Sequence, residues 1–330
     1  MKFLHTVFAA VLAGAAALPA TAAEAPTVEA VLGAVVALHT EIPAGARTAE
    51  TLGPERDGHG VVIDADGLVL TIGYLILEAE SVTVSAADGA PVPARILAYD
   101  HATGFGLLRA EQKLGVQPMA LAKSAAAEDG DLVIVAGAGG PGSAIQARIV
   151  SRRGFTGYWE YMLDEAIFTM PPHPVFGGAA LIDAGGRLLG IGSLFVNDAA
   201  GPGEFSPGNM FVPIDLLKPI LADLIADGRS AAPPRPWLGM ITHEAPGGLF
   251  VARASHDGPA QLAGILPGSL VLALQGKPIR SQEDFYRRLW AAGAPGVTVR
   301  LTLIDPTGEP GEIDVVTGDR YDWLGLGGKD

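Results

Sequence analysis

The sequence predicts a mainly β protein, with a barrel or sandwich of short strands followed by a smaller α+β domain. Glycine and proline are frequent, with 44 and 25 of the 330 residues, and they separate short apolar runs along the chain. These runs follow one another without the helices that a parallel α/β sheet would need. A change to helical spacing at 213–227, followed by a proline-rich linker at 229–236, divides the chain into two domains.

The first 23 residues have the composition of a secretory signal peptide. A charged end is followed by an almost wholly apolar run, Phe3–Leu18, and by small residues at Ala20–Ala23. A membrane anchor is the alternative, but the apolar run is shorter than the about 20 residues that span a bilayer. We therefore expect cleavage after residue 22 or 23, no stable membrane span afterwards, and a periplasmic or secreted protein.

Composition argues against several classes of function. The chain has 22 basic and 36 acidic residues, a formal net charge of −14. Nucleic acid and anionic membranes are bound by clustered lysine and arginine, so neither is expected as a partner. There is no cysteine, which excludes disulfides, thiolate metal sites and thiol nucleophiles. The histidines show no spacing typical of a zinc site, and neither a metal nor a cofactor is expected.

The first domain is expected to be a series of short strands joined by tight turns. Residues 27–38 suit a short helix that leads into a strand, and residues 41–57 have the polar, glycine- and proline-rich composition of a surface loop. An Asp-Gly turn at Asp64–Gly67 joins two apolar runs into a hairpin. A helix at 213–227 ends the domain at Gly228. The expected strands are residues 59–63, 68–71, 82–85, 92–97, 105–109, 132–136, 145–151, 166–169, 179–182 and 188–191.

The stretch Pro171–Gly192 reads P-P-H-P-V-F-G-G-A-A-L-I-D-A-G-G-R-L-L-G-I-G and predicts a Gly-Gly turn followed by a buried hairpin. It resembles the nucleophile hairpin of trypsin-like serine proteases of the HtrA type. The hairpin Gly58–Thr71 and the segment Tyr99–Arg109 are similar to two further parts of that family's protease domain. The resemblance implies a chymotrypsin/trypsin-like double β-barrel for residues 24–228.

The resemblance places the three catalytic positions on residues without catalytic chemistry. The general-base histidine corresponds to Tyr74, the acidic residue to Gly104 and the nucleophilic serine to Phe176. A serine protease needs a hydroxyl, a base that titrates near neutrality and a carboxylate that orients the base. One donor of the oxyanion hole corresponds to Pro174, which has no N–H. A degenerate triad, no catalytic residue and a pseudoenzyme are therefore predicted.

Other residues near these positions offer alternatives. His101 and His173 lie close in sequence to the lost acid and nucleophile, and Ser193 follows the hairpin. A replacement dyad would need one of these histidines within hydrogen-bond reach of a hydroxyl. Both histidines are more simply interpreted as loop residues, His173 in a surface turn. Asp64 and Asp66 are interpreted as turn residues and not as a metal site.

Residues 237–317 resemble the bacterial PDZ domain that follows HtrA proteases, with residues 318–330 as a tail. The resemblance rests on W-L-G-M-I at Trp237–Ile241, on Gly258–Ile279 and on a helix at Gln282–Ala292. Such domains bind an extended peptide as an added β-strand and hold its terminal carboxylate in a nest of backbone N–H groups.

The resemblance assigns peptide binding to five residues. Leu238, Gly239 and Met240 would form the nest and the pocket floor. Phe285 and Leu289, one helical turn apart, would wall an apolar pocket. A role as core residues is the alternative for Leu238 and Leu289. The inferred partners are peptides or protein C-termini, and a related active protease is a further candidate.

The predicted function is that of a catalytically inactive HtrA-like protein that binds peptides or protein C-termini as a scaffold, regulator or holding partner in protein quality control. The alternative is an active serine-type endopeptidase with an unrecognised or partner-supplied catalytic set. A third possibility is a barrel that only supports the PDZ domain mechanically. Reactivity toward a fluorophosphonate probe separates the first two interpretations.

Overall fold

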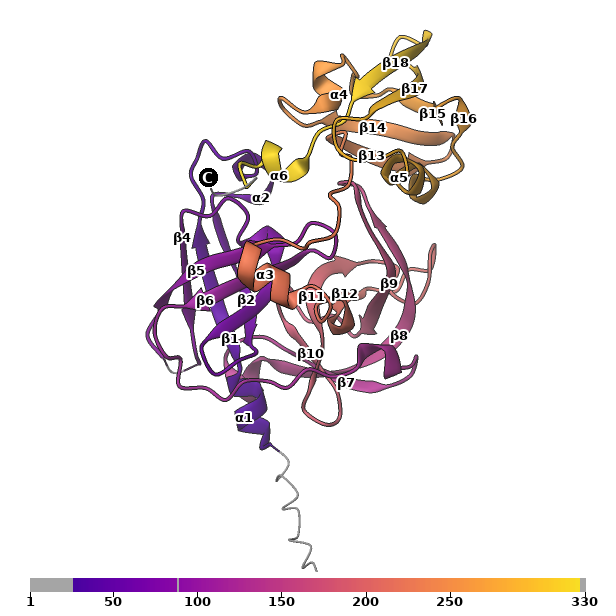
Figure 1. Ribbon diagram of the computed structural model, residues 1–330. Coiled ribbons are helices and arrows are strands. Elements are labelled where there is room, and N and C mark those ends of the chain that lie inside the picture. Colours follow the sequence, from indigo (N-terminus) through magenta and orange to yellow (C-terminus); the bar gives the residue numbers. More distant parts are fainter. Residues whose placement is uncertain (1–25, 88, 327–330) are drawn as a thin grey trace, which may run out of the picture.

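The computed structural model describes residues 26–87 and 89–326. They form two closed β-barrels and a third, smaller sheet, which lies above the barrels in Figure 1. The predicted mainly β fold with a double barrel is confirmed. The predicted signal peptide, residues 1–23, lies outside the described residues.

The first barrel consists of six antiparallel strands in the order β1-β2-β3-β6-β5-β4, closed by pairing of β1 with β4. The predicted turn between β2 and β3 is stabilised by Asp64, whose Oδ1 accepts hydrogen bonds from the N–H groups of Asp66 and Leu68. Asp64 also pairs with Arg109, so its carboxylate has a structural role. The elements are α1 (Val28–Gly33), β1 (Val35–Glu41), α2 (Ala49–Leu52), β2 (Glu55–Val62), β3 (Leu68–Ile72), η1 (Gly73–Leu75), β4 (Ser81–Ser85), β5 (Val92–Tyr99) and β6 (Phe105–Ala110).

The second barrel has the order β10-β11-β12-β9-β8-β7. Its strands β8 and β9 form a long hairpin that extends beyond the barrel toward the C-terminal sheet (Figure 1). The elements are η2 (Ser124–Ala126), β7 (Leu132–Ala136), η3 (Gly140–Ser143), β8 (Ala144–Gly157), β9 (Tyr161–Met170), β10 (Ala180–Ile182), β11 (Leu188–Val196), β12 (Gly208–Pro213), η4 (Ile214–Leu216) and α3 (Leu221–Asp227).

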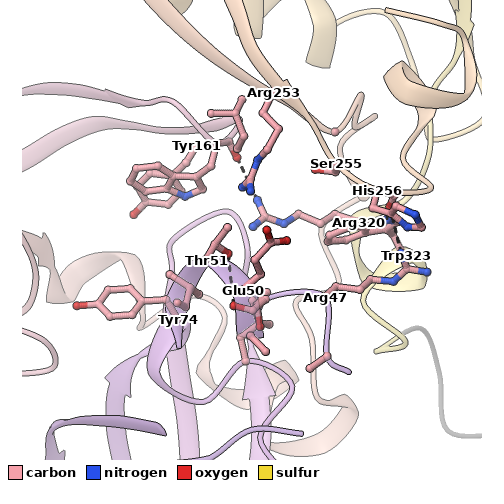
Figure 2. A pocket seen from close by; sticks show the side chains of 18 of the residues that line it. Arg47, Glu50, Thr51, Tyr74, Tyr161, Arg253, Ser255, His256, Arg320 and Trp323 are labelled. Carbon is pink, nitrogen blue, oxygen red and sulfur yellow. Dashed lines mark hydrogen bonds between the residues drawn. The ribbon is translucent and has the colours of Figure 1, made fainter. Parts of the chain in front are cut away.

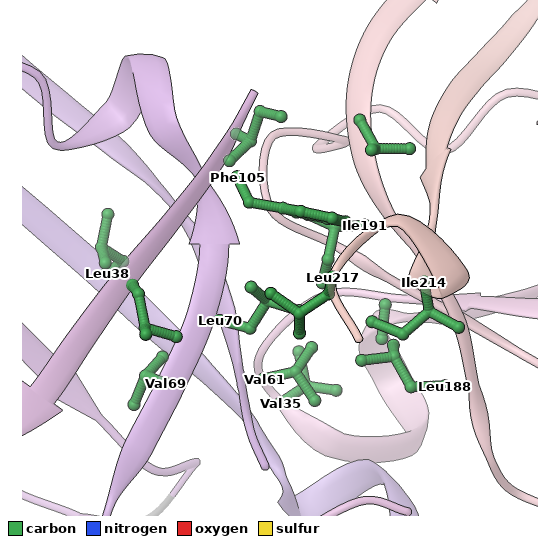
Figure 3. Packing of buried hydrophobic residues seen from close by; sticks show 14 of the residues in the cluster. Val35, Leu38, Val61, Val69, Leu70, Phe105, Leu188, Ile191, Ile214 and Leu217 are labelled. Atoms are coloured by element: carbon green, nitrogen blue, oxygen red, sulfur yellow. The ribbon is translucent and has the colours of Figure 1, made fainter. Parts of the chain in front are cut away.

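One apolar core runs across both barrels (Figure 3). Leu70 and Phe105 of the first barrel and Ile191 of the second are almost fully buried within it. Burying such a side chain stabilises the fold by roughly 1.5–3 kcal/mol. This shared core fixes the two barrels against each other and so positions the loops at their junction.

Residues 237–318, called here the C-terminal domain, have a separate core. Its sheet has the order β13-β14-β15-β17-β18, with β16 paired to β15, so that β13 is an edge strand. The tail helix α6 lies between this domain and the first barrel (Figure 1). The elements are β13 (Met240–Ala245), β14 (Gly248–Ala254), α4 (Pro259–Leu262), β15 (Leu270–Leu274), β16 (Lys277–Pro278), α5 (Gln282–Trp290), β17 (Thr298–Ile304), β18 (Pro310–Val316) and α6 (Arg320–Trp323).

Three local expectations are wrong. The helix expected at 213–227 is interrupted between η4 and α3, where Pro219 has no N–H to continue it. The loop expected at 41–57 contains α2 and the first residues of β2. Strands β8 and β9 are longer than the expected 145–151 and 166–169, because their outer halves pair with each other and not with the barrel.

Candidate functional site

The positions predicted for the triad lie together at a cleft of about 1270 Å³ between the barrels and the C-terminal domain. Tyr74 comes from η1, Gly104 from the loop before β6 and Phe176 from the turn before β10. Figure 2 shows Arg253 and Arg320 reaching into the cleft from the side opposite Tyr74. The barrel positions and the C-terminal domain therefore face a common space.

Tyr74 is held as a neutral hydrogen-bond donor. Its hydroxyl donates to the backbone carbonyl of Ser193 at 3.0 Å. Burial raises the pKa of the Tyr74 phenol well above its usual range. A phenol that stays protonated and donates its hydrogen to a carbonyl cannot act as a general base.

The space for a carboxylate at position 104 is taken by Tyr161. Gly104 has φ +82°, and a Cβ added there would lie 3.1 Å from the hydroxyl oxygen of Tyr161. That hydroxyl donates to the carbonyl of Thr103 at 2.6 Å, and Tyr161 is buried. The tyrosine ring thus fills the region in which an acidic side chain would have to reach a histidine.

The turn that carries Phe176 is tightly packed. The Phe176 carbonyl accepts a hydrogen bond from the N–H of Ala179 at 3.0 Å. The same carbonyl oxygen is 2.1 Å from the point where a Cβ at Gly192 would be, so glycine is required there. Gly178 adjoins the neighbouring strand and donates to the Gly192 carbonyl at 2.9 Å. The exposed Pro174 has no N–H to offer in this turn.

The residues considered for a replacement dyad are not brought together. His173 is buried and not in a surface turn, because its ring nitrogens lie 2.8 and 3.1 Å from the carbonyls of Val175 and Ser143. His101 contacts Tyr99 and Arg320 through its ring nitrogens, and burial, together with Arg320, holds its pKa well below the usual value. No hydrogen bond found among residues 26–87 and 89–326 joins either ring to Ser193.

His59 of β2 lies next to the turn before β10, where its N–H donates to the Gly177 carbonyl, and it is not among the functional residues predicted from the sequence. Its Nδ1 accepts a hydrogen bond from the N–H of Ala138 at 3.1 Å, so the proton is on Nε2. That Nε2 is buried without a hydrogen-bond partner among the described residues. Burial and the neighbouring His173 lower the pKa of His59 to about 4, which keeps the ring neutral. In this tautomer Nε2 has no lone pair with which to accept a proton.

The C-terminal domain holds a carboxylate on backbone N–H groups at the start of β13. The N–H groups of Leu238 and Met240 donate to the two carboxylate oxygens of Glu160 at 3.1 and 2.9 Å. Gly239 between them has φ +76°, a left-handed conformation that turns the two flanking N–H groups toward one point. The three residues predicted for the nest therefore meet the carboxylate of Glu160, whose role no local sequence pattern indicates.

Glu160 is at the tip of the β8–β9 hairpin and is almost completely buried. Burial raises the pKa of its carboxyl group to about 7, although the backbone N–H groups of Leu238 and Met240 and the charge of Arg320 lower it. Its φ of +56° is unusual for a residue with a side chain and costs about 1–2 kcal/mol. The tip keeps this conformation because its contacts with the C-terminal domain outweigh that cost.

A polar network around Tyr286 of α5 also joins the hairpin to the C-terminal domain. The Tyr286 hydroxyl donates to the Gly157 carbonyl at 3.1 Å and accepts from the N–H of Glu160 at 3.1 Å. It also accepts from the side chain of Gln282, and lies 3.0 Å from the Thr242 hydroxyl. The ring is completely buried. Phe285 and Leu289 of the same helix are completely buried too, within the core of the C-terminal domain.

Aromatic side chains line the contact between the barrels and the C-terminal domain. Trp159 of the hairpin tip stacks on Tyr161, with ring centroids 5.4 Å apart. The ring centroids of Trp237 and of Trp323 in the tail helix are 4.8 Å apart, which places α6 against the C-terminal domain. Tyr321 of the same helix accepts a hydrogen bond from the N–H of His101 in the first barrel at 3.0 Å. The tail therefore contacts both parts of the molecule.

Comparison with known proteins relates both the sequence and the fold to proteases. The family described as the trypsin-like peptidase domain matches residues 58–191. The chain is 28% identical over 240 residues to a probable periplasmic serine endoprotease (DegP-like) of Ectopseudomonas mendocina, covering 69% of this chain and 49% of the relative. It is 26% identical over 286 residues to the serine protease PepD of Mycobacterium tuberculosis, covering 79% and 61%. The chain spans about half the length of the curated relatives it matches.

Solved structures are similar over nearly the whole chain. The serine endoprotease from Yersinia pestis has a TM-score of 0.52 and 22% identity, covering 89% of this chain and 98% of that one. The HtrA-type protease AlgW with a tripeptide has a TM-score of 0.51 and 22% identity, with the same coverage. At these identities the likeness shows the fold, which is the trypsin-like fold of HtrA-type proteases.

These findings contradict the prediction that the chain is a pseudoenzyme. The matching relatives are named serine endoproteases, and the matching family is one of peptidase domains. The prediction is wrong because it rested on the side chains at 74, 104 and 176 alone, whereas the similarity to peptidases extends over residues 58–191 and over most of the chain. The chain is therefore similar in sequence to DegP-like serine endoproteases and has the trypsin-like fold of HtrA-type proteases.

Proposed function

We propose that this chain is a periplasmic or secreted serine-type endopeptidase of the HtrA kind that captures protein C-termini through a PDZ domain at residues 237–317. The observation that carries the proposal is the binding of a carboxylate by the N–H groups of Leu238 and Met240. Relatives named as periplasmic serine endoproteases support the activity and the location. No helix within 26–87 or 89–326 combines the length and the apolar character needed to cross a membrane.

Capture of a C-terminus would use the nest and the edge strand together. The terminal carboxylate would accept from the N–H groups of residues 238–240, and the peptide backbone would extend along β13, whose outer edge is unpaired within its own sheet. Phe285 and Leu289 of α5, which are buried in the domain core, would support the apolar pocket for the terminal side chain from beneath. The proposal assigns residues 229–236 to a linker and residues 318–330 to a tail.

The carboxylate requirement gives a direct test. Fluorescein-labelled decapeptides ending in Val or Phe should bind, and their C-terminal amides should bind about 10- to 100-fold more weakly, because a charge-assisted hydrogen bond contributes about 1.5–3 kcal/mol. Gly239→Asp should abolish binding, since it places a negative charge and a Cβ at a left-handed glycine of the nest. Fluorescence anisotropy measures both effects.

Gly264→Asp is the matched control. Gly264 has φ +83° and open space around its Cα, so the substitution imposes the same backbone cost away from the nest. It should bind the acid peptides as the wild type does. Equal affinity for acids and amides would contradict a carboxylate site at residues 238–240.

Hydrolysis is assigned to groups other than the side chains at 74, 104 and 176, in this chain or supplied by a related active protease. Support comes from the relatives' activity and not from a dyad among the described residues. A fluorophosphonate probe should therefore label the protein above a heat-killed control, and unfolded casein should be cleaved. Labelling should persist in Tyr74→Phe, because the hydroxyl that this variant lacks donates its hydrogen bond to the Ser193 carbonyl.

Mass spectrometry of the labelled protein identifies the nucleophile. Labelling of a single serine or threonine would define the catalytic set from which further variants follow. Absence of labelling above the heat-killed control, together with intact casein, would contradict the endopeptidase assignment and leave the C-terminus capture to be judged by the peptide titrations.

A further inference from the structure

The groove to which the proposed function assigns a protein C-terminus is filled by the chain's own β8–β9 hairpin. We propose that the hairpin tip, residues 158–160, is an internal ligand of the C-terminal domain that an external C-terminus must displace in order to bind. This inference rests on the proposed function and specifies how the same site is regulated.

The tip makes both kinds of contact that a bound C-terminus would make. The Glu160 side chain places a carboxylate on the N–H groups of Leu238 and Met240. Two residues earlier, the Tyr158 carbonyl accepts from the N–H of Thr242 on the edge strand β13 at 2.9 Å. One backbone hydrogen bond thus joins the tip to the edge strand β13, and the Glu160 side chain places its carboxylate where a terminal carboxylate would bind.

The two occupants exclude each other. Each backbone N–H group donates one strong hydrogen bond, and those of Leu238, Met240 and Thr242 are already used by the hairpin. Glu160 is 1% exposed, so no room is left beside its carboxylate for a second one. Two carboxylates placed on the same N–H groups would also repel each other. An external C-terminus therefore binds only when the tip has left.

Further contacts connect the occupied groove to the rest of the molecule. Arg287 of α5 pairs with Asp164 of β9 at 2.6 Å, and Arg320 of the tail donates to the Trp159 carbonyl at 3.1 Å. Tyr158 and Trp159 line the same cleft as Tyr74 and Phe176. Departure of the tip would consequently alter the cleft at the barrel junction as well as open the groove.

The experiment compares wild type, Glu160→Ala and Glu165→Ala in titrations with fluorescein-labelled decapeptides ending in Val or Phe. Glu165 lies on the same hairpin and carries the same charge, but it pairs with Arg152 within the barrel and serves as the control. If the groove is open in about a tenth of wild-type molecules, Glu160→Ala should bind about tenfold more tightly. Glu165→Ala should match the wild type. Glu160→Gln, which preserves the size of the side chain, should lie between them.

Hydrogen exchange provides a second measurement on the intact protein. Acid peptide added to wild type should increase exchange of the amides in residues 155–163, while the amide peptide should leave it unchanged. Equal affinities of wild type and Glu160→Ala for the acid peptides would overturn the internal ligand but leave capture of C-termini standing. No binding of acid peptide by any variant would contradict the proposed function, and the inference would fall with it.

Discussion

Replacing Gly178 with alanine is expected to lower the free energy of unfolding by about 3 kcal/mol or more, close to the upper end of single-residue effects. Gly178 has φ +75°, and a Cβ there would lie 1.8 Å from the His59 carbonyl oxygen and 2.7 Å from Oγ1 of Thr71. The left-handed conformation alone costs a residue with a side chain about 1–2 kcal/mol. The added Cβ would also collide with the His59 carbonyl, so β2 or the β10–β11 hairpin would have to move, which lowers the free energy of unfolding further. Denaturant unfolding measures the loss.

Gly203→Ala separates the two contributions. Gly203 has a similar φ of +80° with nothing within 4 Å of the added Cβ, so only the conformational cost of about 1–2 kcal/mol is expected. A loss of unfolding free energy in Gly178→Ala no larger than that in Gly203→Ala would show that the turn before β10 can shift at little energetic cost. The turn would then not hold Phe176 in a fixed place at the cleft.

Tyr286→Phe is expected to destabilise the contact between the hairpin and the C-terminal domain by about 2–3 kcal/mol. Removing the hydroxyl leaves the Gly157 carbonyl and the Glu160 N–H without their partner in a buried setting, and an unsatisfied buried polar group costs about 1–3 kcal/mol. Hydrogen exchange of residues 155–163 should rise, and thermal unfolding of the C-terminal domain should begin earlier. The phenyl ring itself remains, so its packing against Trp290 is retained.

Tyr158→Phe is the matched substitution. Tyr158 has the same side chain on the hairpin tip but is 59% exposed, so its change should fall within about 0.5 kcal/mol. If both variants exchange alike at residues 155–163, the hydroxyl network around Tyr286 does not hold the hairpin.

Local sequence predicted those parts of the fold that local chemistry determines. The turn at Asp64–Gly67 was predictable because the Asp64 side chain bonds to N–H groups only two and four residues later. The strands of both barrels followed from short apolar runs between glycine-rich turns. The resemblance located Tyr74, Gly104 and Phe176, and these three residues line one cleft.

The features that were missed depend on contacts between distant segments. Nothing near Glu160 in sequence indicates that its partners are N–H groups at 238 and 240, because the contact exists only once two domains are folded together. The outer halves of β8 and β9 pair mainly with each other and carry little apolar alternation, so their length was underestimated. His173, with prolines on both sides, was placed at the surface, whereas two backbone carbonyls hold its ring inside.

The aromatic contacts described above have a spectroscopic consequence. The chain has four tryptophans, and all of them surround the junction of the barrels and the C-terminal domain: Trp159 at the hairpin tip, Trp237 before β13, Trp290 at the end of α5 and Trp323 in α6. The interiors of the two barrels carry none. Tryptophan emission from the unlabelled protein therefore reports on this junction, and stopped-flow fluorescence can time its opening without any added dye.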